Sequence, residues 1–159
     1  FPRLRKINIG VANYSSGTEN VIFKVDNKKF SSLICYESTF PDINRQHAKL
    51  GVDFITFLVN DAWYIKWPEP EQHARQSIYR AIENRKSVIR CANTGISLVI
   101  DPSGYVREKT NLNENDIITT TVKKVNHITF YTKFGNVFAY ILLIILGVLF
   151  ILTFKKNEE

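Results

Sequence analysis

The stretch Leu33–Ser38, which reads Leu-Ile-Cys-Tyr-Glu-Ser, carries the strongest local signal in the chain. An apolar run ends on Cys35, a carboxylate follows at Glu37, and the pattern then breaks into Ser-Thr-Phe-Pro. An α/β enzyme can present a nucleophile in this way, because a strand that leaves the core holds the thiol rigidly at the edge of solvent. The alternative is that Cys35 is a small buried hydrophobic residue, as many cysteines are.

The size and charge of the chain narrow the classes of function. With 159 residues, 45% of them hydrophobic, the chain is long enough for one domain with a core and too apolar for disorder. The net charge is +6, but the lysines and arginines are dispersed. This pattern favours an anionic membrane surface over nucleic acid. Outside the cytoplasm the two cysteines, Cys35 and Cys91, could also form a disulfide.

A long apolar segment lies near the C-terminus. Residues 137–154 carry no charged side chain and are followed by Lys155 and Lys156. A helix of this length reaches ~27 Å, close to the thickness of a hydrocarbon core, so we expect a transmembrane helix. The alternative is a buried helix of a soluble protein, but this run is apolar on all sides. The positive-inside rule predicts that the tail 155–159 is cytoplasmic and the folded domain lies outside.

The first residue is Phe1, and no export signal precedes the domain. A domain outside the cytoplasm needs an upstream segment to export it. We therefore expect that the sequence is the C-terminal part of a longer protein, with residues 1–18 a loop left from the upstream region.

Strand and helix patterns alternate along the chain and predict an α/β sandwich. Two β-rich runs on either side of residues 26–29 predict a hairpin. A short helix should follow, with Ser38 or Thr39 as its cap and Pro41 in its first turn, and Asp101-Pro102-Ser103-Gly104 is a turn signal. The expected strands are 21–25, 30–35, 52–59, 87–92, 96–100, 105–109 and 117–122, and the longer helix is 71–86.

Polar residues stand where two of these elements end or begin. Asn60-Asp61-Ala62-Trp63 follows a strand, where α/β folds place binding groups, although a plain turn with a packed tryptophan fits equally. His73, near the start of the longer helix, could pair with Cys35 as in a thiol protease, or could be an ordinary helix residue. His47 shares a helix face with apolar residues and is not expected to be a ligand.

Several short motifs occur in a fixed order, namely Cys35-Tyr36-Glu37, Asn60-Asp61-Ala62-Trp63, Gln72-His73, Arg90-x-x-Asn93-x-Gly95 and Asp101-Pro102-x-Gly104. As an ordered set they resemble the nitrilase, or carbon–nitrogen hydrolase, superfamily. The final apolar helix after Tyr131-x-x-x-Gly135-Asn136 makes the chain more similar to the membrane branch of that superfamily, the apolipoprotein N-acyltransferases. The resemblance runs from Phe30 to the C-terminus.

The resemblance implies a fold, a place in the cell and an activity. It implies the C-terminal part of a nitrilase-like α-β-β-α sandwich at 19–126, an approach segment at 127–136 and one transmembrane helix at 137–154. The catalytic domain would lie on the outer side of the bacterial cytoplasmic membrane. Members of that branch move an acyl chain from a phospholipid, through a thioester on a cysteine, to the N-terminal diacylglyceryl-cysteine of lipoproteins. This is the last step of lipoprotein maturation. No cofactor, metal or nucleic acid is expected.

Carried over residue by residue, the resemblance assigns roles at the site. Cys35 would be the nucleophile, the backbone N–H of Tyr36 an oxyanion donor, and Glu37 a supporting group. Asn60 and Trp63 would bind substrate. Glu37 could equally be an ordinary loop carboxylate.

The sequence departs from the family pattern in two ways. The family also uses a glutamate base and a lysine upstream of its cysteine, but Glu19, Lys24, Lys28 and Lys29 match no family motif, so neither role is transferred. The chain alone is therefore expected to be inactive. In the loop Trp63-Tyr64-Ile65, many relatives have glycine at the third place, which leaves its backbone path open. Two other functions stay open: a membrane-tethered amidase of nitrilase type, and a membrane-anchored binding module that has lost the chemistry.

Overall fold

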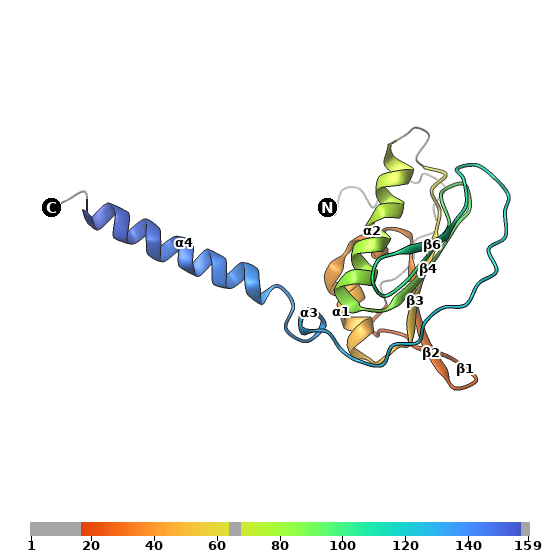
Figure 1. Cartoon of the computed structure of the whole chain (residues 1–159), viewed down its shortest axis with the longest axis horizontal. Helices are drawn as coiled ribbons and strands as arrows, with labels where there is room; N and C mark the ends of the chain where they lie inside the picture. Colours follow the sequence, from red (N-terminus) through yellow and green to blue (C-terminus); the bar gives the residue numbers. More distant parts are fainter. Residues whose placement is uncertain (1–16, 64–67, 157–159) are drawn as a thin grey trace.

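A computed structural model of the chain describes residues 17–63 and 68–156, with side chains up to residue 154. It consists of an α/β domain and a long C-terminal helix that extends away from it (Figure 1). The predictions for residues 1–16, and for Tyr64 and Ile65, lie outside the described residues.

One sheet of six strands forms the centre of the domain, and the strands lie side by side in chain order. The first pair is antiparallel, as the predicted hairpin requires; β2, β3 and β4 are parallel, and β5 and β6 add antiparallel partners. Parallel strands need a crossover, which η2 with α1 and then α2 provide. The carboxyl ends of β2, β3 and β4 therefore meet at one edge of the sheet. The strands are β1 Phe23–Val25, β2 Lys28–Ile34, β3 Phe54–Val59, β4 Ser87–Ala92, β5 Leu98–Ile100 and β6 Val106–Lys109.

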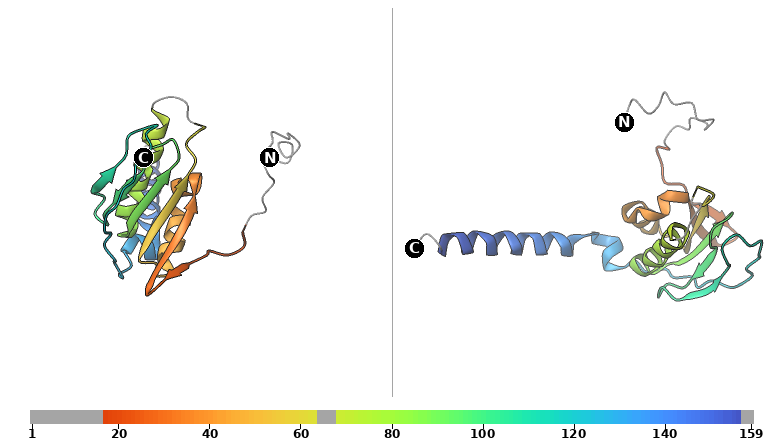
Figure 2. Two further views of the ribbon diagram at one scale, coloured as in Figure 1. Left: turned by 90° about the vertical axis from the view of Figure 1, so that its right-hand side faces the viewer. Right: turned by 90° about the horizontal axis from the view of Figure 1, so that it is seen from above.

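Two helices, α1 (Pro41–Lys49) and α2 (Glu69–Asn84), lie on one side of the sheet (Figures 1 and 2). Side chains alternate along a strand, so every second residue of β2, β3 and β4 points into this layer. Leu33, Phe57 and Val88 do so and are fully or almost fully buried. The register pairs Leu33 with Phe57 and Phe57 with Arg90, which brings an arginine into the apolar layer.

The residues between them point to the opposite face, which is only partly covered in the described part of the chain. Ile34 is 66% exposed and Leu58 is 53% exposed, although both are strand residues at the centre of the sheet. Cys91 on β4 is exposed on the same face. Exposed apolar side chains at adjacent positions of neighbouring strands are typical of a surface that another layer covers.

The predicted hairpin, both helices and the strands up to residue 109 are confirmed, with shifts of a few residues at some ends. The cap of α1 was predicted wrongly. Its N-cap is Phe40, while the hydroxyls of Ser38 and Thr39 donate to the carbonyls of Cys35 and Tyr36. The reason is that Cys35–Thr39 forms a separate 3-10 helix, η2, before α1 begins. Serine and threonine hydroxyls readily make such local bonds to the backbone.

The predicted strand 117–122 is also wrong, since these residues have no regular structure. The connection after β6 instead returns to the amino ends of β3 and β4. There the Ser87 hydroxyl donates to the carbonyl of Lys123, and the ammonium of Lys86 donates to the carbonyl of Val125. These bonds from side chains replace the backbone ladder that a β-rich sequence would otherwise make.

The approach segment contains a short helix, α3 (Phe130–Phe134), that is fastened to the domain. Thr129 caps it and also donates to the carbonyl of Glu83, and the buried Thr132 hydroxyl donates to Asn84. After Gly135 the chain enters α4 (Val137–Lys156), whose residues 137–154 are long and apolar enough to cross a membrane and are not buried in the structure. The prediction of one apolar C-terminal helix is confirmed.

Candidate active site

Cys35 lies where β2 turns into η2, in a backbone conformation that side chains rarely adopt. Its φ is +49°, in the left-handed region, which costs about 1–2 kcal/mol for a residue other than glycine. Two bonds hold this turn: Glu37 Oε2 accepts from the N–H of Ile34 at 2.7 Å, and the Ser38 hydroxyl donates to the Cys35 carbonyl at 2.7 Å. The result is a strained, half-buried cysteine on a turn that two hydrogen bonds hold, and it follows the end of a strand as the sequence predicted.

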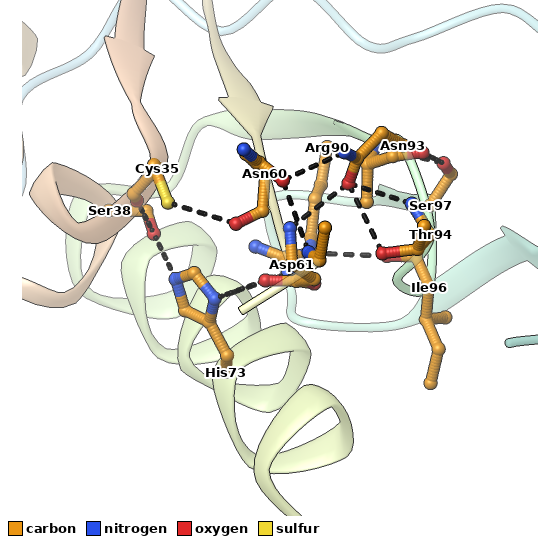
Figure 3. A network of polar contacts seen from close by, with 12 residues as sticks. Cys35, Ser38, Asn60, Asp61, His73, Arg90, Asn93, Thr94, Ile96 and Ser97 are labelled. Atoms are coloured by element: carbon orange, nitrogen blue, oxygen red, sulfur yellow. Dashed lines mark hydrogen bonds and ion pairs between the residues drawn. The ribbon is translucent and has the colours of Figure 1, made fainter. Parts of the chain in front are cut away.

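The thiol of Cys35 points to the carboxyl end of β3. Its Sγ lies 3.6 Å from the backbone carbonyl of Asn60, within reach of a weak hydrogen bond (Figure 3). The Asn60 side chain turns the other way, accepting from Nδ2 of Asn93 at 2.7 Å and from the N–H of Ala62 at 3.1 Å. Cys35 and Asn60 are thus brought together as predicted, because parallel strands end at the same edge. The contact, however, uses the backbone of Asn60.

Next to Asn60, the carboxylate of Asp61 is fully buried and makes two strong contacts. Its Oδ2 lies 2.5 Å from Nη2 of Arg90, and its Oδ1 lies 2.8 Å from Nδ1 of His73. Burial alone would raise the pKa of this carboxyl, but the hydrogen bond from His73 and the charge of Arg90 outweigh it and hold the pKa below its ordinary value. Asp61 is therefore ionised at neutral pH.

The structure does not form the dyad of Cys35 and His73 that the sequence left open as one alternative. The Nδ1 of His73 faces Asp61, and its Nε2 lies 3.2 Å from the hydroxyl of Ser38. The thiol of Cys35 bonds to Asn60 instead. His73 therefore lies beneath the turn that carries Cys35, and the side chain of Ser38 stands between them. The disulfide that the sequence left open is not formed either, since Cys35 and Cys91 are both free.

The other predicted site residues lie nearby but differ in exposure. Tyr36 is 59% exposed, packs edge-on against Phe40, and lines a pocket of about 200 Å³ together with His73. Trp63 is 72% exposed at the end of the described loop, and no role is shown for it. The lysines near residue 28 begin β2, whose seven residues place them ~23 Å from Cys35. At that distance these lysines do not reach Cys35, in agreement with the prediction that they have no catalytic role.

Sequence reasoning gave no role in the site to Ser38, Asp61, Arg90, Asn93 or Gly95. Four of them stand in the motifs on which the family resemblance rests, so a signal was present in the sequence. Asn93 joins the ends of β3 and β4, accepting from the N–H of Asp61 and donating to Asn60. Their roles depend on contacts between distant segments, which the sequence could not supply.

The family comparison agrees with this geometry. The family described as carbon–nitrogen hydrolase matches residues 5–127. The chain belongs to the carbon–nitrogen hydrolase family. Its fold is also that of solved family members. Nit3 of Saccharomyces cerevisiae, a member of branch 10 of the nitrilase superfamily, superposes with a TM-score of 0.53 at 22% identity, over 64% of this chain and 40% of that one.

Curated relatives that resemble the chain over most of its length are apolipoprotein N-acyltransferases. The chain is 40% identical over 147 residues to an apolipoprotein N-acyltransferase of Rickettsia prowazekii, covering 91% of this chain and 29% of that protein. It is 30% identical over 158 residues to an apolipoprotein N-acyltransferase of Geobacter metallireducens, covering 99% of this chain and 30% of that protein. The chain therefore spans under a third of the length of these curated relatives.

Proposed function

We propose that this chain is the C-terminal part of an apolipoprotein N-acyltransferase, an enzyme with Cys35 as its nucleophile. The observation that carries the proposal is Cys35 itself, held at a positive φ at the end of β2. This residue lies within the matched carbon–nitrogen hydrolase region, in a chain whose curated relatives bear that name. The apolar helix α4 supports the membrane branch of the family.

The proposed chemistry has two steps and needs no cofactor. In the first, Cys35 sulfur attacks the ester carbonyl of a phospholipid, the C–S bond forms and the C–O bond breaks, and the thiol proton leaves on the lysophospholipid oxygen. In the second, the α-amino nitrogen of a diacylglyceryl-cysteine attacks the thioester. The C–N bond forms, the C–S bond breaks, and a proton from the amine returns to sulfur. A thioester suits both steps, because thiolate is a good nucleophile and a good leaving group.

Residues next to Cys35 would serve the first step. The N–H of Tyr36 lies in the first turn of η2, where backbone N–H groups have no partner within the helix, so it would donate to the developing oxyanion. Glu37 would act by holding the turn, through its bond to the N–H of Ile34. Asn60 and Trp63 would border the acyl and head-group site at the end of β3.

The remainder of the catalytic apparatus would come from upstream sequence. A glutamate base and an oxyanion-stabilising lysine belong to the family pattern, and we place both in the part of the protein that precedes this chain. The same part would cover the open face of the sheet at Ile34 and Leu58, completing the sandwich. The domain would lie outside the bacterial cytoplasmic membrane, with residues 137–154 crossing it and residues 155–159 in the cytoplasm.

Trapping of the acyl-enzyme tests the function. The complete protein, in proteoliposomes that contain phospholipid, is expected to form a thioester adduct on Cys35, seen as an acyl mass on the peptide that carries it. Cys35→Ser should abolish the adduct, and Cys91→Ser should not, because Cys91 is a free cysteine on the opposite face. An unchanged rate in Cys35→Ser would refute the assignment. Hydrolysis of small amides without phospholipid would point to an amidase, and full activity in cells with Cys35→Ala to a binding module.

The coding sequence upstream of Phe1 gives a second test. A continuing reading frame with membrane helices, a glutamate and a lysine supports the proposed acyltransferase. A stop codon directly upstream contradicts it.

A further inference from the structure

A continuous chain of buried polar groups runs from β4 to the backbone of the nucleophile. It begins with the ion pair of Arg90 and Asp61 at 2.5 Å, continues through His73 Nδ1 at 2.8 Å, and reaches the Ser38 hydroxyl from His73 Nε2 at 3.2 Å. The Ser38 hydroxyl in turn lies 2.7 Å from the carbonyl oxygen of Cys35 (Figure 3). The side chains of this chain are at least 95% buried.

The number of hydrogens on these groups restricts how the bonds can form. An ionised Asp61 only accepts, so Nδ1 of His73 carries a hydrogen and donates to it. The Ser38 hydroxyl has one hydrogen, which can go either to the carbonyl of Cys35 or to Nε2 of His73. Both contacts form together only when Nε2 also carries a hydrogen and donates to Ser38. The hydrogen on Nε2 of His73 is thereby linked to the bond that Ser38 makes to the peptide carbonyl of Cys35.

The surroundings of His73 favour a fixed ring. Three residues from different elements contact His73: Asp61 at the end of β3, Arg90 on β4 and Tyr36 in η2. Glu69 and Gln72, from the first turns of α2, line the same small pocket as His73. A buried ring held at both nitrogens cannot rotate without breaking bonds in a low-dielectric environment. The ring of His73 therefore links the position of Asp61, at the end of β3, to that of Ser38 in the turn at Cys35.

We propose that Asp61 and His73 are positioning residues, which act through Ser38 to hold the strained peptide of Cys35 in the geometry needed for attack. The inference rests on the proposed function, because it assumes that Cys35 is acylated. Asp61, His73 and Ser38 are at least 95% buried, so we assign them no direct contact with the acyl donor. Their loss should slow acylation and leave the KM for phospholipid unchanged.

Ser38→Ala in the complete protein is the first test. It removes the hydroxyl that joins His73 to the carbonyl of Cys35 and changes side-chain volume little. The rate of Cys35 acylation, measured by rapid quench and mass spectrometry, is expected to fall about tenfold, as for loss of one buried hydrogen bond. A rate within about twofold of the wild-type rate overturns the proposal, since such a change is below that of one bond.

Two substitutions of His73 separate positioning from simple packing. In His73→Gln the amide nitrogen reaches the place of Nε2 and keeps the bond to Ser38, whereas in His73→Asn it takes the place of Nδ1 and keeps only the contact with Asp61. We expect Gln to retain acylation within about threefold and Asn to lose about tenfold. His73→Asn combined with Ser38→Ala should be no slower than either alone. Equal losses for Gln and Asn, or losses that multiply in the double variant, indicate a packing role and overturn the proposal.

His47→Asn is the matched control, because His47 is equally buried, at 5% exposed, but lies in α1. Its acylation rate should match that of the wild-type protein at pH 8. The same series is run with a p-nitrophenyl ester, an activated acyl donor that needs no phospholipid site. If Cys35 is acylated by this ester but never by phospholipid, the proposed function fails and the positioning role is still measured. If Cys35 is acylated by phospholipid and the Ser38 and His73 variants behave like the control, the positioning role alone fails.

Discussion

A side chain at Gly95 would overlap the carboxylate of Asp61: a Cβ built there meets Oδ2 and lies 2.7 Å from Cγ. Gly95 follows β4 and Asp61 follows β3. The backbone of Gly95 therefore packs against the side chain of Asp61, at the edge of the sheet where Cys35 lies. Asp61 cannot withdraw, because Arg90 and His73 hold its two oxygens. The absence of a side chain at residue 95 is therefore a condition for the buried network.

Gly95→Ala should consequently lower the free energy of unfolding by about 1–3 kcal/mol, the usual range for overpacking a close-packed site. Denaturant unfolding of the complete protein in micelles measures this. Gly17→Ala is the control, because a Cβ at Gly17 meets no atom of the described residues within 4 Å. Equal stability of the two alanine variants would contradict the close contact.

Asp61→Asn should lower the free energy of unfolding by more than its small change in shape suggests. The substitution takes the carboxylate of Asp61 away from the buried guanidinium of Arg90, and breaking a buried ion pair typically costs about 3–5 kcal/mol. Glu71→Gln is the control, because its ion pair with Arg75 is at the surface and should contribute under about 1 kcal/mol. The unfolding midpoints of the two variants measure their losses of stability. A loss in Asp61→Asn no greater than that in Glu71→Gln would show that water solvates Arg90.

His47 should make the protein less stable in mild acid. Burial lowers the pKa of His47 below its ordinary 6.5, only partly opposed by the charge of Glu37. Above pH 6.5 the imidazole is neutral in both states; below it, the unfolded chain takes up a proton that the folded state resists. Stability is therefore full above pH 6.5 and declines as the pH falls from there toward the lower pKa of the folded state.

His47→Asn should remove this decline. The quantity to measure is the difference in unfolding free energy between the two proteins at pH 8 and at pH 5.5, because contributions of other titrating groups cancel in that difference. The wild-type protein should lose more stability than the variant over this interval. Parallel pH profiles would show that His47 is protonated as easily in the folded state as in the unfolded chain.

Thr132→Val should loosen the short helix that joins the domain to α4. The hydroxyl of Thr132 is buried and donates to Oδ1 of Asn84 at 2.9 Å, so an isosteric valine leaves that oxygen without this donor. We expect a loss of about 1–3 kcal/mol and faster amide exchange in residues 129–135. Thr120→Val, at an exposed position, should change neither. Unchanged exchange in Thr132→Val would mean that this bond does not hold α3.

The sequence by itself determined most of the elements and the position of Cys35 at the end of a strand. Apolar periodicity and turn residues act within a few positions, so the hairpin, α2, the strands through residue 109 and the apolar α4 were predictable. The failure at residues 117–122 has the same origin, since β-rich composition does not reveal that Ser87 and Lys86 bind the returning chain.

Only the tertiary structure decided what surrounds Cys35. The bonds from Ser38 to His73, from His73 to Asp61 and from Asp61 to Arg90 join residues 35, 12 and 29 positions apart. Such partners are chosen by the order and register of parallel strands, which bring the ends of β2, β3 and β4 to one edge. A pattern read along the chain shows which side chains can bond; it cannot show which of them the sheet places together.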